Sequence, residues 1–374
     1  MGGPLAIVGF LALILLVVIP IHELGHLLVA RRFGFKIQEY FVGFGPKLWS
    51  MKRGETEYGI KAIPAGGYVK IAGMNPYETV PAEDVARAYG SKSIWQRALV
   101  ILAGPLSHVL VGGLLYLTLF VTYGDSNTEL VVVGEVAPTL DGSPSPALVA
   151  GLQVGDVVTR VGDLEAPTPD SLGRYVTRYA EDSPGEPLTY VIERDGRSLT
   201  LEIVPRLVTE DEVTRGRIGF TLGAEDLSIP ASVVESGEWV GRAAWASVET
   251  IPKIFTEGVG RTFSVLFSDE PRKINDPTSL VGVSRQIGDA GAQGNWGLFL
   301  NFAAYVTIFI GVVNLIPLPP LDGGHLMLLA WERVTGRQAD YRKLVPVSAA
   351  VIVFLSVFAI ATVFLDITEP LPLI

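Results

Sequence analysis

Three polar residues in the first long apolar run of the chain have the types and spacing of a metal site. They belong to His22-Glu23-Leu24-Gly25-His26, an H-E-x-x-H motif within the run Pro4 to Ala30. On a helix, positions i and i+4 share one face, so both imidazoles can reach one zinc ion, with Glu23 beside them as general base for a water on the metal. A charge near the centre of a bilayer costs roughly 2.5 to 3.5 kcal/mol, so these residues need a compensating partner. We therefore predict Zn2+ here; the alternative is a polar cluster that holds helices together.

A catalytic zinc ion takes three protein ligands and leaves a fourth position open. The chain has no cysteine, so only histidines and carboxylates remain as ligands. The candidates for the third ligand are His108, Asp322, His325 and Glu332. Asp322 is preferred because it lies in NLIPLPPLDGGH (Asn314 to His325), whose prolines and glycines predict a broken helix. Backbone exposed at such a break must be buried in protein or line a wet cavity.

The composition indicates that a membrane holds these residues. Of 374 residues, 49% are hydrophobic and 18% are charged, whereas soluble domains carry roughly 25% charged residues. The mean hydropathy is +0.39. The net charge of −10 argues against a nucleic-acid binder. Four apolar runs are long enough to span a bilayer: Pro4 to Ala30, Ala98 to Tyr123, Trp296 to Trp331 and Leu344 to Leu365. A signal peptide is the alternative for the first run, which however lacks a basic start and a small-residue cleavage site.

Basic residues predict the orientation of the four runs, because loops rich in Lys and Arg stay in the cytoplasm. Arg31 to Arg97 contains 11 basic and 6 acidic residues, whereas Tyr123 to Gly241 contains 8 and 21. Trp331 to Lys343 contains four basic and two acidic residues. The loops Arg31 to Arg97 and Trp331 to Lys343 are therefore predicted to be cytoplasmic. The loop Tyr123 to Gly241 and both termini are predicted to be extracytoplasmic.

The extracytoplasmic segment is predicted to contain an α+β domain. Short β-branched runs alternate with turn residues at Leu130 to Val133, Val154 to Val161, Leu188 to Ile192 and Leu199 to Val204, with a helical stretch at Asp170 to Tyr179. Ser145 to Asp163 (SPALVAGLQVGDVVTRVGD) resembles the core of bacterial PDZ domains. Ile218-Gly219-Phe220 resembles the loop with which these domains hold a terminal carboxylate, and an ordinary edge strand fits this tripeptide as well. Apolar residues at helical spacing from Trp245 to Phe267 predict an amphipathic helix, at the membrane surface or packed on the PDZ domain.

The pairing of HELGH in a first membrane run with N-x-x-P-x-P-x-L-D-G-G in a later one resembles the site-2 proteases, in particular the bacterial RseP-like group with one PDZ domain. The resemblance covers nearly the whole chain. It implies an intramembrane zinc metalloprotease with zinc ligands His22, His26 and Asp322, the base Glu23 and a substrate-contacting Asn314. It also implies regulated intramembrane proteolysis in the bacterial cell membrane. The substrates would be single-span membrane proteins, such as anti-sigma factors after a first cleavage, or remnant signal peptides.

A β-hairpin is predicted between Phe35 and Gly73, where alternating runs follow the sequence GFGP. The resemblance implies that this hairpin dips into the membrane beside the metal; an ordinary cytoplasmic hairpin is the alternative. An unwound substrate could satisfy its backbone groups by pairing with an edge strand, so Val69 and Ile71 are predicted to bind substrate. His108 departs from the family, whose members usually have Asn in G-P-x-x-N, and we expect it to bond a neighbouring helix rather than zinc.

The predicted fold class is an α-helical polytopic membrane protein with about four transmembrane helices, a membrane-associated β-hairpin and an inserted α+β PDZ domain. The predicted parts are the first helix (4–30), the hairpin region (31–97), the second helix (98–123), the PDZ domain (126–224), the amphipathic helix region (242–268), the broken third segment (296–331) and the fourth helix (344–365). The alternative function is a metal-ion transporter or metal-binding membrane scaffold that uses the same His and Asp residues. That alternative leaves the position of Glu23 and the PDZ-like domain unexplained.

Overall fold

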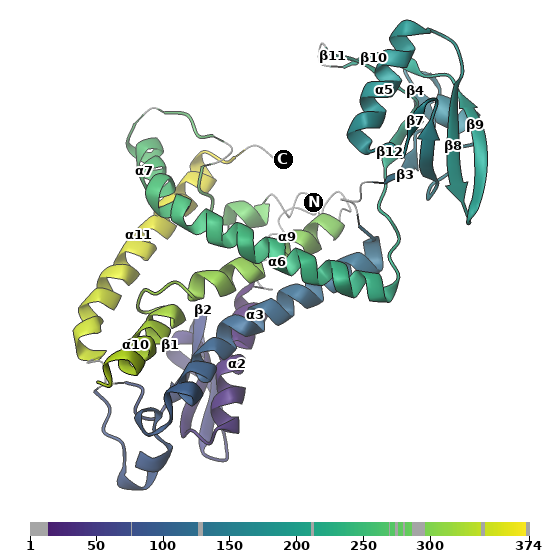
Figure 1. Ribbon diagram of the computed structural model, residues 1–374. Helices are drawn as coiled ribbons and strands as arrows, with labels where there is room; N and C mark the ends of the chain where they lie inside the picture. Colours follow the sequence, from purple (N-terminus) through teal and green to yellow (C-terminus); the bar gives the residue numbers. More distant parts are fainter. Residues whose placement is uncertain are drawn as a thin grey trace. The chain divides into compact units, whose positions relative to one another are not determined.

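The computed structural model describes residues 14–75, 77–125, 130–210, 213–268, 270–273, 276–279, 281–285, 296–337 and 341–371. The chain divides into two compact units, Met1–Thr118 with Ser236–Ile374 and Leu119–Glu235 (Figure 1). Residues 4–13, which begin the first predicted membrane run, lie outside the described residues.

Long helices make up most of the first unit (Figure 1). Three described helices are long and apolar enough to cross a membrane: α3 (Ile94–Tyr123), α9 (Trp296–Asn314) and Arg342–Thr368, which contains α11 (Val345–Thr368). The H-E-x-x-H motif lies on α2 (Ile19–Arg32), which continues the short π-helix η1 (Ile14–Val18). Three of the four predicted crossings therefore have a described helix of sufficient length.

The third predicted run is interrupted between α9 and α10 (Asp322–Thr335). The linker between them, residues 315–321, contains three prolines, which have no N–H group to continue a helix. The two glycines that follow Asp322 allow the linker to lie against the first turn of α10. A Cβ on Gly323 would stand 2.2 Å from Leu315 O, and a Cβ on Gly324 would stand 2.6 Å from the nitrogen of Pro319. Because neither glycine has a side chain, the linker packs closely on the start of α10, and Asp322 is the first residue of that helix.

β1 (Ile37–Arg53) and β2 (Thr56–Ile71) form a long hairpin whose strands bend back on themselves. Residues 39–42 of β1 pair both with residues 57–60 and with residues 67–70 of β2. Within the described parts of the chain, residues 67–71 pair with no strand other than β1, so their other edge is open to a further strand, and the backbone of Val69 on this edge faces Glu23. The hydroxyl of Tyr40 donates to Pro20 O at 2.8 Å and so attaches the hairpin to the start of α2.

Charged groups anchor the turn of this hairpin. The carboxylate of Glu55 accepts hydrogen bonds from Arg87 Nη1 at 2.9 Å and from Lys36 Nζ at 3.0 Å. Arg87 ends the 3-10 helix η2 (Ala82–Arg87), so the contact joins three separate segments. The hydrogen bonds from Arg87 and then Lys36 lower the pKa of Glu55 from 4.5 to about 2. The turn is therefore held by an ionised carboxylate.

The predicted amphipathic region is helical and begins earlier than expected. α6 (Ile229–Lys253) continues through the π-helix η4 (Ile254–Gly258) into α7 (Val259–Phe267). Trp245 and Phe267 are exposed, whereas Thr262 and Val265 are buried. The ring of Phe255 stacks on Phe354 of α11 with a centroid distance of 6.3 Å. This long helix therefore packs on α11 and leaves other apolar side chains exposed.

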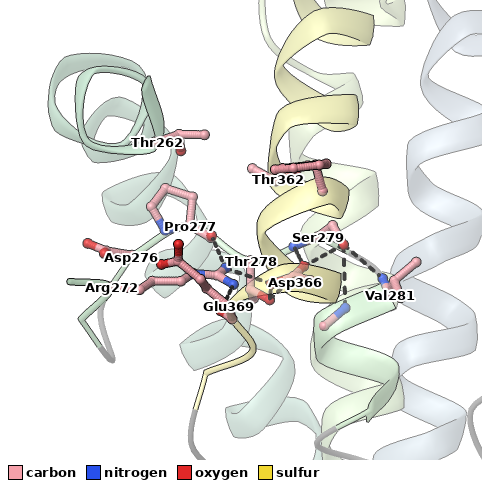
Figure 2. Close-up of polar contacts among 12 residues, drawn as sticks. Thr262, Arg272, Asp276, Pro277, Thr278, Ser279, Val281, Thr362, Asp366 and Glu369 are labelled. Atoms are coloured by element: carbon pink, nitrogen blue, oxygen red, sulfur yellow. Dashed lines mark hydrogen bonds and ion pairs between the residues drawn. The ribbon is translucent and has the colours of Figure 1, made fainter. Parts of the chain in front are cut away.

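A buried polar cluster attaches the end of α11 to the segment that follows α7 (Figure 2). The carboxylate of Asp366, which is 4% exposed, accepts hydrogen bonds from Arg272 Nη2 at 2.6 Å, from Ser279 Oγ at 2.6 Å and from Ser279 N at 2.7 Å. Arg272 Nη1 also donates to Glu369 O at 2.9 Å. These hydrogen bonds satisfy the carboxylate of the buried ion pair, as buried charges require, whereas Nε of Arg272 is buried without a hydrogen-bond partner in the described part of the chain.

The second unit contains a sheet with the strand order β12-β3-β6-β8-β9, and β7 pairs with β6. Its elements are β3 (Val131–Val136), β4 (Thr139–Leu140), β5 (Ser143–Pro144), α4 (Pro146–Val149), β6 (Val157–Val161), β7 (Leu164–Glu165), α5 (Pro169–Asp182), β8 (Leu188–Arg194), β9 (Arg197–Ile203) and β12 (Phe220–Leu222). The predicted strands correspond to β3, β6, β8 and β9, and the predicted helix corresponds to α5. The core joins Tyr190 and Ile192 of the sheet to Leu172 and Val176 of α5.

A separate two-stranded hairpin in this unit, outside the larger sheet, was not predicted. It consists of β10 (Arg206–Glu210) and β11 (Val213–Arg217). The backbone N–H of Gly216 donates to Thr177 Oγ1 of α5 at 3.0 Å. A Cβ on Gly216 would stand 2.6 Å from Val176 O, so only glycine permits this close approach of strand and helix.

Candidate metal centre

Three side chains from α2 and α10 bring their ligand atoms to one point. His22 and His26 lie one turn apart on α2, and their Nε2 atoms are 3.1 Å from each other. Asp322 Oδ2 lies 3.2 Å from His22 Nε2 and 3.5 Å from His26 Nε2. Among the described residues, these three are the group of histidines and carboxylates able to hold a metal ion.

The geometry of this group fits a zinc ion. Ligand atoms at about 2.0 to 2.1 Å from zinc in a tetrahedral site lie about 3.3 Å from one another, close to the three distances observed. Asp322 Oδ2 is buried and faces both imidazoles, yet it accepts no hydrogen bond of normal geometry. A buried carboxylate oxygen without a hydrogen bond needs a cation. Two imidazole nitrogens and one carboxylate oxygen are also a ligand set found in catalytic zinc sites.

Glycines let α3 approach the two imidazoles closely. A Cβ on Gly104 of α3 would stand 2.4 Å from His26 Nε2 and 2.7 Å from His22 Cε1. A Cβ on Gly25 of α2 would stand 2.4 Å from Ala103 O. Small residues at such crossings are typical of helices packed in membranes. The side chains of the motif therefore lie directly against the backbone of α3.

Groups of α3 also contact the second nitrogen of each imidazole. His26 Nδ1 donates to Val100 O at 2.7 Å. His22 Nδ1 lies 3.0 Å from His108 Nε2. Both partners are buried in the helix interface, so each ligand is held at the nitrogen that does not face Asp322.

An ion pair connects α3 to the helix of Asp322. Arg97 Nη1 and Nη2 donate to the two carboxylate oxygens of Glu332 at 2.9 and 2.7 Å. The two side chains are 5% and 13% exposed. Glu332 is on α10, so this bidentate contact fixes the helix whose first residue is Asp322. Glu332 is thereby engaged away from the metal centre.

A cavity of about 240 Å³ opens at the metal centre. The predicted base Glu23 lines it beside β2, where a Cβ on Gly67 would stand 3.0 Å from Glu23 Cγ. The predicted substrate-binding residues Val69, Ile71 and Asn314 line the same cavity. The amide of Asn314 donates to Ile310 O of its own helix at 3.1 Å. The structure therefore brings every predicted site residue to one cavity.

The remaining candidate ligands occupy other positions. His325 lines the cavity but does not belong to the group of converging ligand atoms. His108 contacts His22 at the nitrogen that points away from that group. The preference for Asp322 over the other candidates therefore agrees with the geometry of the site.

Of the supporting residues on α3, only His108 was predicted from the sequence, as a residue that bonds a neighbouring helix, and its contact with His22 of α2 agrees with this. Arg97, Val100, Gly104 and His108 recur at intervals of three and four residues and so share one helix face. That face meets α2 and α10, but the apolar sequence around it gives it no distinctive pattern. Arg97 and His108, the one arginine and the one histidine of α3, are the signal that could have found this face.

A larger cavity of about 1010 Å³ lies within the second unit. It is lined by α5 and by the segment that runs from β11 into β12. Ile218, Gly219 and Phe220 are among the lining residues. The tripeptide predicted to hold a carboxylate is therefore at the wall of this cavity.

Comparisons with known proteins give the family. The chain matches peptidase family M50 over residues 10–358. It is 32% identical to the zinc metalloprotease Rip1 of Mycobacterium tuberculosis over 406 residues, which cover 97% of each chain. It is 33% identical to the Rip1 of Mycolicibacterium smegmatis over 399 residues, with 96% and 97% covered. A putative zinc metalloprotease of Bartonella henselae is 31% identical over 338 residues, with 86% and 90% covered.

These matches confirm the resemblance noted in the sequence and set aside the alternative of a metal-ion transporter. They also confirm zinc as the cofactor, in agreement with the three converging ligand atoms. The apolar helices agree with an enzyme that resides in a membrane. The chain therefore belongs to peptidase family M50, the site-2 proteases, and is an intramembrane zinc metalloprotease.

Proposed function

We propose that the enzyme cuts transmembrane segments of single-span membrane proteins, with His22, His26 and Asp322 as zinc ligands and Glu23 as general base. The observation that carries this proposal is the meeting of the three ligand atoms at a cavity that Glu23 also lines. Zinc held by these residues supplies a Lewis acid for the scissile carbonyl and lowers the pKa of a water to about 7.

The residues of the chain move the protons and place the substrate. Glu23 accepts a proton from the attacking water and returns it to the amine nitrogen that leaves. Val100 O of α3 accepts from Nδ1 of His26, so Nε2 of His26 stays directed at Asp322. Asn314, at the end of α9, places its side chain at the wall of the cavity, where it can contact the substrate backbone.

Purified variants in detergent test the assignment of Glu23. Glu23→Gln is expected to lower hydrolysis of a transmembrane peptide by about 10² to 10⁴-fold while zinc stays bound, because only the base is lost. Glu257→Gln, at an exposed site on η4, is the matched control and should change neither quantity. Asp322→Ala should lose both zinc and activity. Retained hydrolysis in Glu23→Gln would reject the assignment.

The open edge of β2 is proposed to bind the substrate as an added strand. A substrate helix must unwind before its carbonyl can be attacked, and each unpaired backbone group in lipid costs several kcal/mol. Pairing with the open edge of residues 67–71 would satisfy those groups. Val69 and Ile71 lie on this edge and also line the cavity at the metal centre.

A proline on this edge tests the pairing. Val69→Pro removes one backbone donor and is expected to reduce cleavage of a helical substrate strongly without lowering zinc content. A substrate with Gly or Pro near the cut site should be affected less, because it unwinds more easily. Val69→Thr keeps the N–H group and the branched side chain and serves as the control. Equal losses for both substrates would point to misfolding, and no loss would remove β2 from the mechanism.

The hairpin is proposed to lie in the membrane. Leu48 and Trp49 of β1 are 68% and 54% exposed, and Phe44, Ile60 and Ile63 are also exposed. Apolar side chains gathered on one small hairpin are typical of a membrane contact. In lipid these side chains would be buried, and the open edge of β2 would be at the depth of a substrate helix.

The second unit is proposed to be an extracytoplasmic PDZ domain that reads new C-termini or excludes substrates with large outer domains. The cavity between α5 and residues 215–222 supports this, because Ile218 to Phe220 line it. We propose that the cavity takes substrates such as anti-sigma factors after a first cleavage. An extracytoplasmic second unit goes with a topology of four crossings in a bacterial cell membrane, with both termini outside.

Single cysteines test this topology, because the natural chain has none. Ser198→Cys on β9 should react with an impermeant reagent added to intact cells, and Glu83→Cys should react only after lysis. Both positions are exposed, so protein burial does not decide the result. Labelling of Glu83→Cys from outside would invert the proposed topology.

A further inference from the structure

His108 is a buried histidine that contacts His22 but does not belong to the group of converging ligand atoms. It is 1% exposed, and its Nε2 lies 3.0 Å from His22 Nδ1. The two rings have a centroid distance of 5.0 Å and an interplanar angle of 47°. On its other side, a Cβ on Gly311 of α9 would stand 2.7 Å from His108 Cβ. Packing between α3 and α9 therefore fixes where this imidazole points.

The contact between His108 and His22 has a counterpart at the other ligand. His26 donates from Nδ1 to Val100 O at 2.7 Å. Val100 and His108 are eight residues apart on α3, on the same helix face, with Gly104 between them. The same face of α3 thus supplies one partner for each imidazole: a backbone carbonyl for His26 and a side chain for His22.

The chemistry of an imidazole ligand sets what each partner must do. A histidine that binds metal through Nε2 carries its proton on Nδ1, and a hydrogen bond from that N–H fixes the tautomer and the plane of the ring. Val100 O can only accept, so it selects this tautomer in His26. A neutral His108 with its own proton on Nδ1 presents Nε2 as an acceptor and selects the same tautomer in His22.

We propose that His108 is a positioning residue that holds the Nδ1–H of His22 and thereby orients its Nε2 toward the zinc. His108 does not bind the metal itself, because its Nε2 faces Nδ1 of His22 rather than the converging Nε2 and Oδ2 atoms. This inference rests on the proposed assignment of His22 as a zinc ligand. Nδ1 of His108 is buried without a hydrogen-bond partner among the described residues, so the contact with His22 is the hydrogen bond that this imidazole makes.

Two variants of similar size separate the hydrogen bond from the packing. His108→Gln keeps an acceptor at the reach of Nε2, whereas His108→Leu fills the space without one. Loss of such a partner lowers metal affinity by about 10 to 100-fold. We expect the zinc dissociation constant, measured by competition with a chelator, to rise by that factor in His108→Leu and by less than about threefold in His108→Gln. Equal affinities in the two variants, whether both weakened or both normal, would overturn the proposal.

A measurement on the unaltered protein does not depend on whether the variants fold. The chain has four histidines, so histidine labelled with ¹⁵N gives a spectrum simple enough to assign. With zinc bound, His22 and His26 should carry protons on Nδ1, and His108 should carry its proton on Nδ1 with Nε2 free to accept. A proton on His108 Nε2 would overturn the proposal.

One further variant distinguishes failure of this inference from failure of the ligand assignment. His22→Ala should lose zinc if His22 is a ligand. If His22→Ala keeps full zinc, the assignment on which the proposal rests is wrong. If His22→Ala loses zinc and His108→Leu binds it normally, the ligand assignment stands and the role of His108 is refuted.

Discussion

Gly104 is the position at which the smallest change in the chain should disturb the metal centre most. An alanine there places a Cβ 2.4 Å from His26 Nε2 and 2.7 Å from His22 Cε1, whereas ordinary contacts begin at 3.4 Å. The helices must therefore separate, or the imidazoles must turn, by about 1 Å to relieve the overlap. Metal sites tolerate changes of only about 0.2 Å in ligand distance. We expect zinc affinity to fall by about 10 to 100-fold and hydrolysis by about 10²-fold.

Gly113→Ala on the same helix is the matched control. A Cβ there meets only Val240 Cγ2, at an ordinary distance of 3.5 Å. Both substitutions raise the helix propensity of α3 by about 1 kcal/mol, so this effect cancels between them. Zinc affinity by chelator competition and initial rates on a transmembrane peptide should differ between the two variants, while both proteins should still fold. Equal zinc affinity in the two variants would refute the close packing of α3 on the imidazoles.

Three further predictions concern the contacts that hold the unit together. Arg97→Gln should lower the melting temperature in detergent, because breaking a buried ion pair costs about 3 to 5 kcal/mol. It should also weaken zinc binding, because the helix that begins at Asp322 loses its contact with α3. An unchanged zinc affinity would show that α10 is fixed by other contacts. The folded pKa of Glu55, about 2, is below its usual 4.5, so its ionised form stabilises the fold above pH 4.5 and this contribution is lost as the pH falls toward 2. The fall in melting temperature between pH 5.5 and 2.5 should therefore be smaller in Glu55→Gln than in the natural protein. Asp366→Asn should destabilise the protein by about 3 to 5 kcal/mol in thermal unfolding, because it leaves a buried guanidinium without its charge partner, whereas a neutral result would place the cluster in solvent.

The residues of the candidate metal centre could be proposed from the sequence because their chemistry is local or carried by rare residue types. The H-E-x-x-H motif fixes His22 and His26 on one helix face by spacing alone. Asp322 is distant in sequence, but the prolines and glycines around it mark a helix break that needs a polar environment. The match to peptidase family M50 confirms the zinc metalloprotease predicted from these residues. The roles of the individual residues stay predictions.

Most of the support of the site was not predictable, because apart from Arg97 and His108 it depends on groups that have no sequence signature. Val100 acts through a backbone carbonyl, which every residue has. Gly104 acts through the absence of a side chain in a run where many small residues occur. The double pairing of residues 39–42 and the packing of Gly216 on α5 depend on tertiary contacts that alternation and turn patterns do not encode.

The cluster around Asp366 also sets an order of events during biosynthesis. Arg272 and Ser279 leave the ribosome before Asp366, which follows Arg272 by 94 residues. Until α11 has been made, the guanidinium of Arg272 lacks the carboxylate with which it pairs in the folded protein. Asp366 in turn enters at the end of an apolar helix, where an unpaired charge is costly. Docking of the last helix is therefore the step that brings the two charges together and buries them.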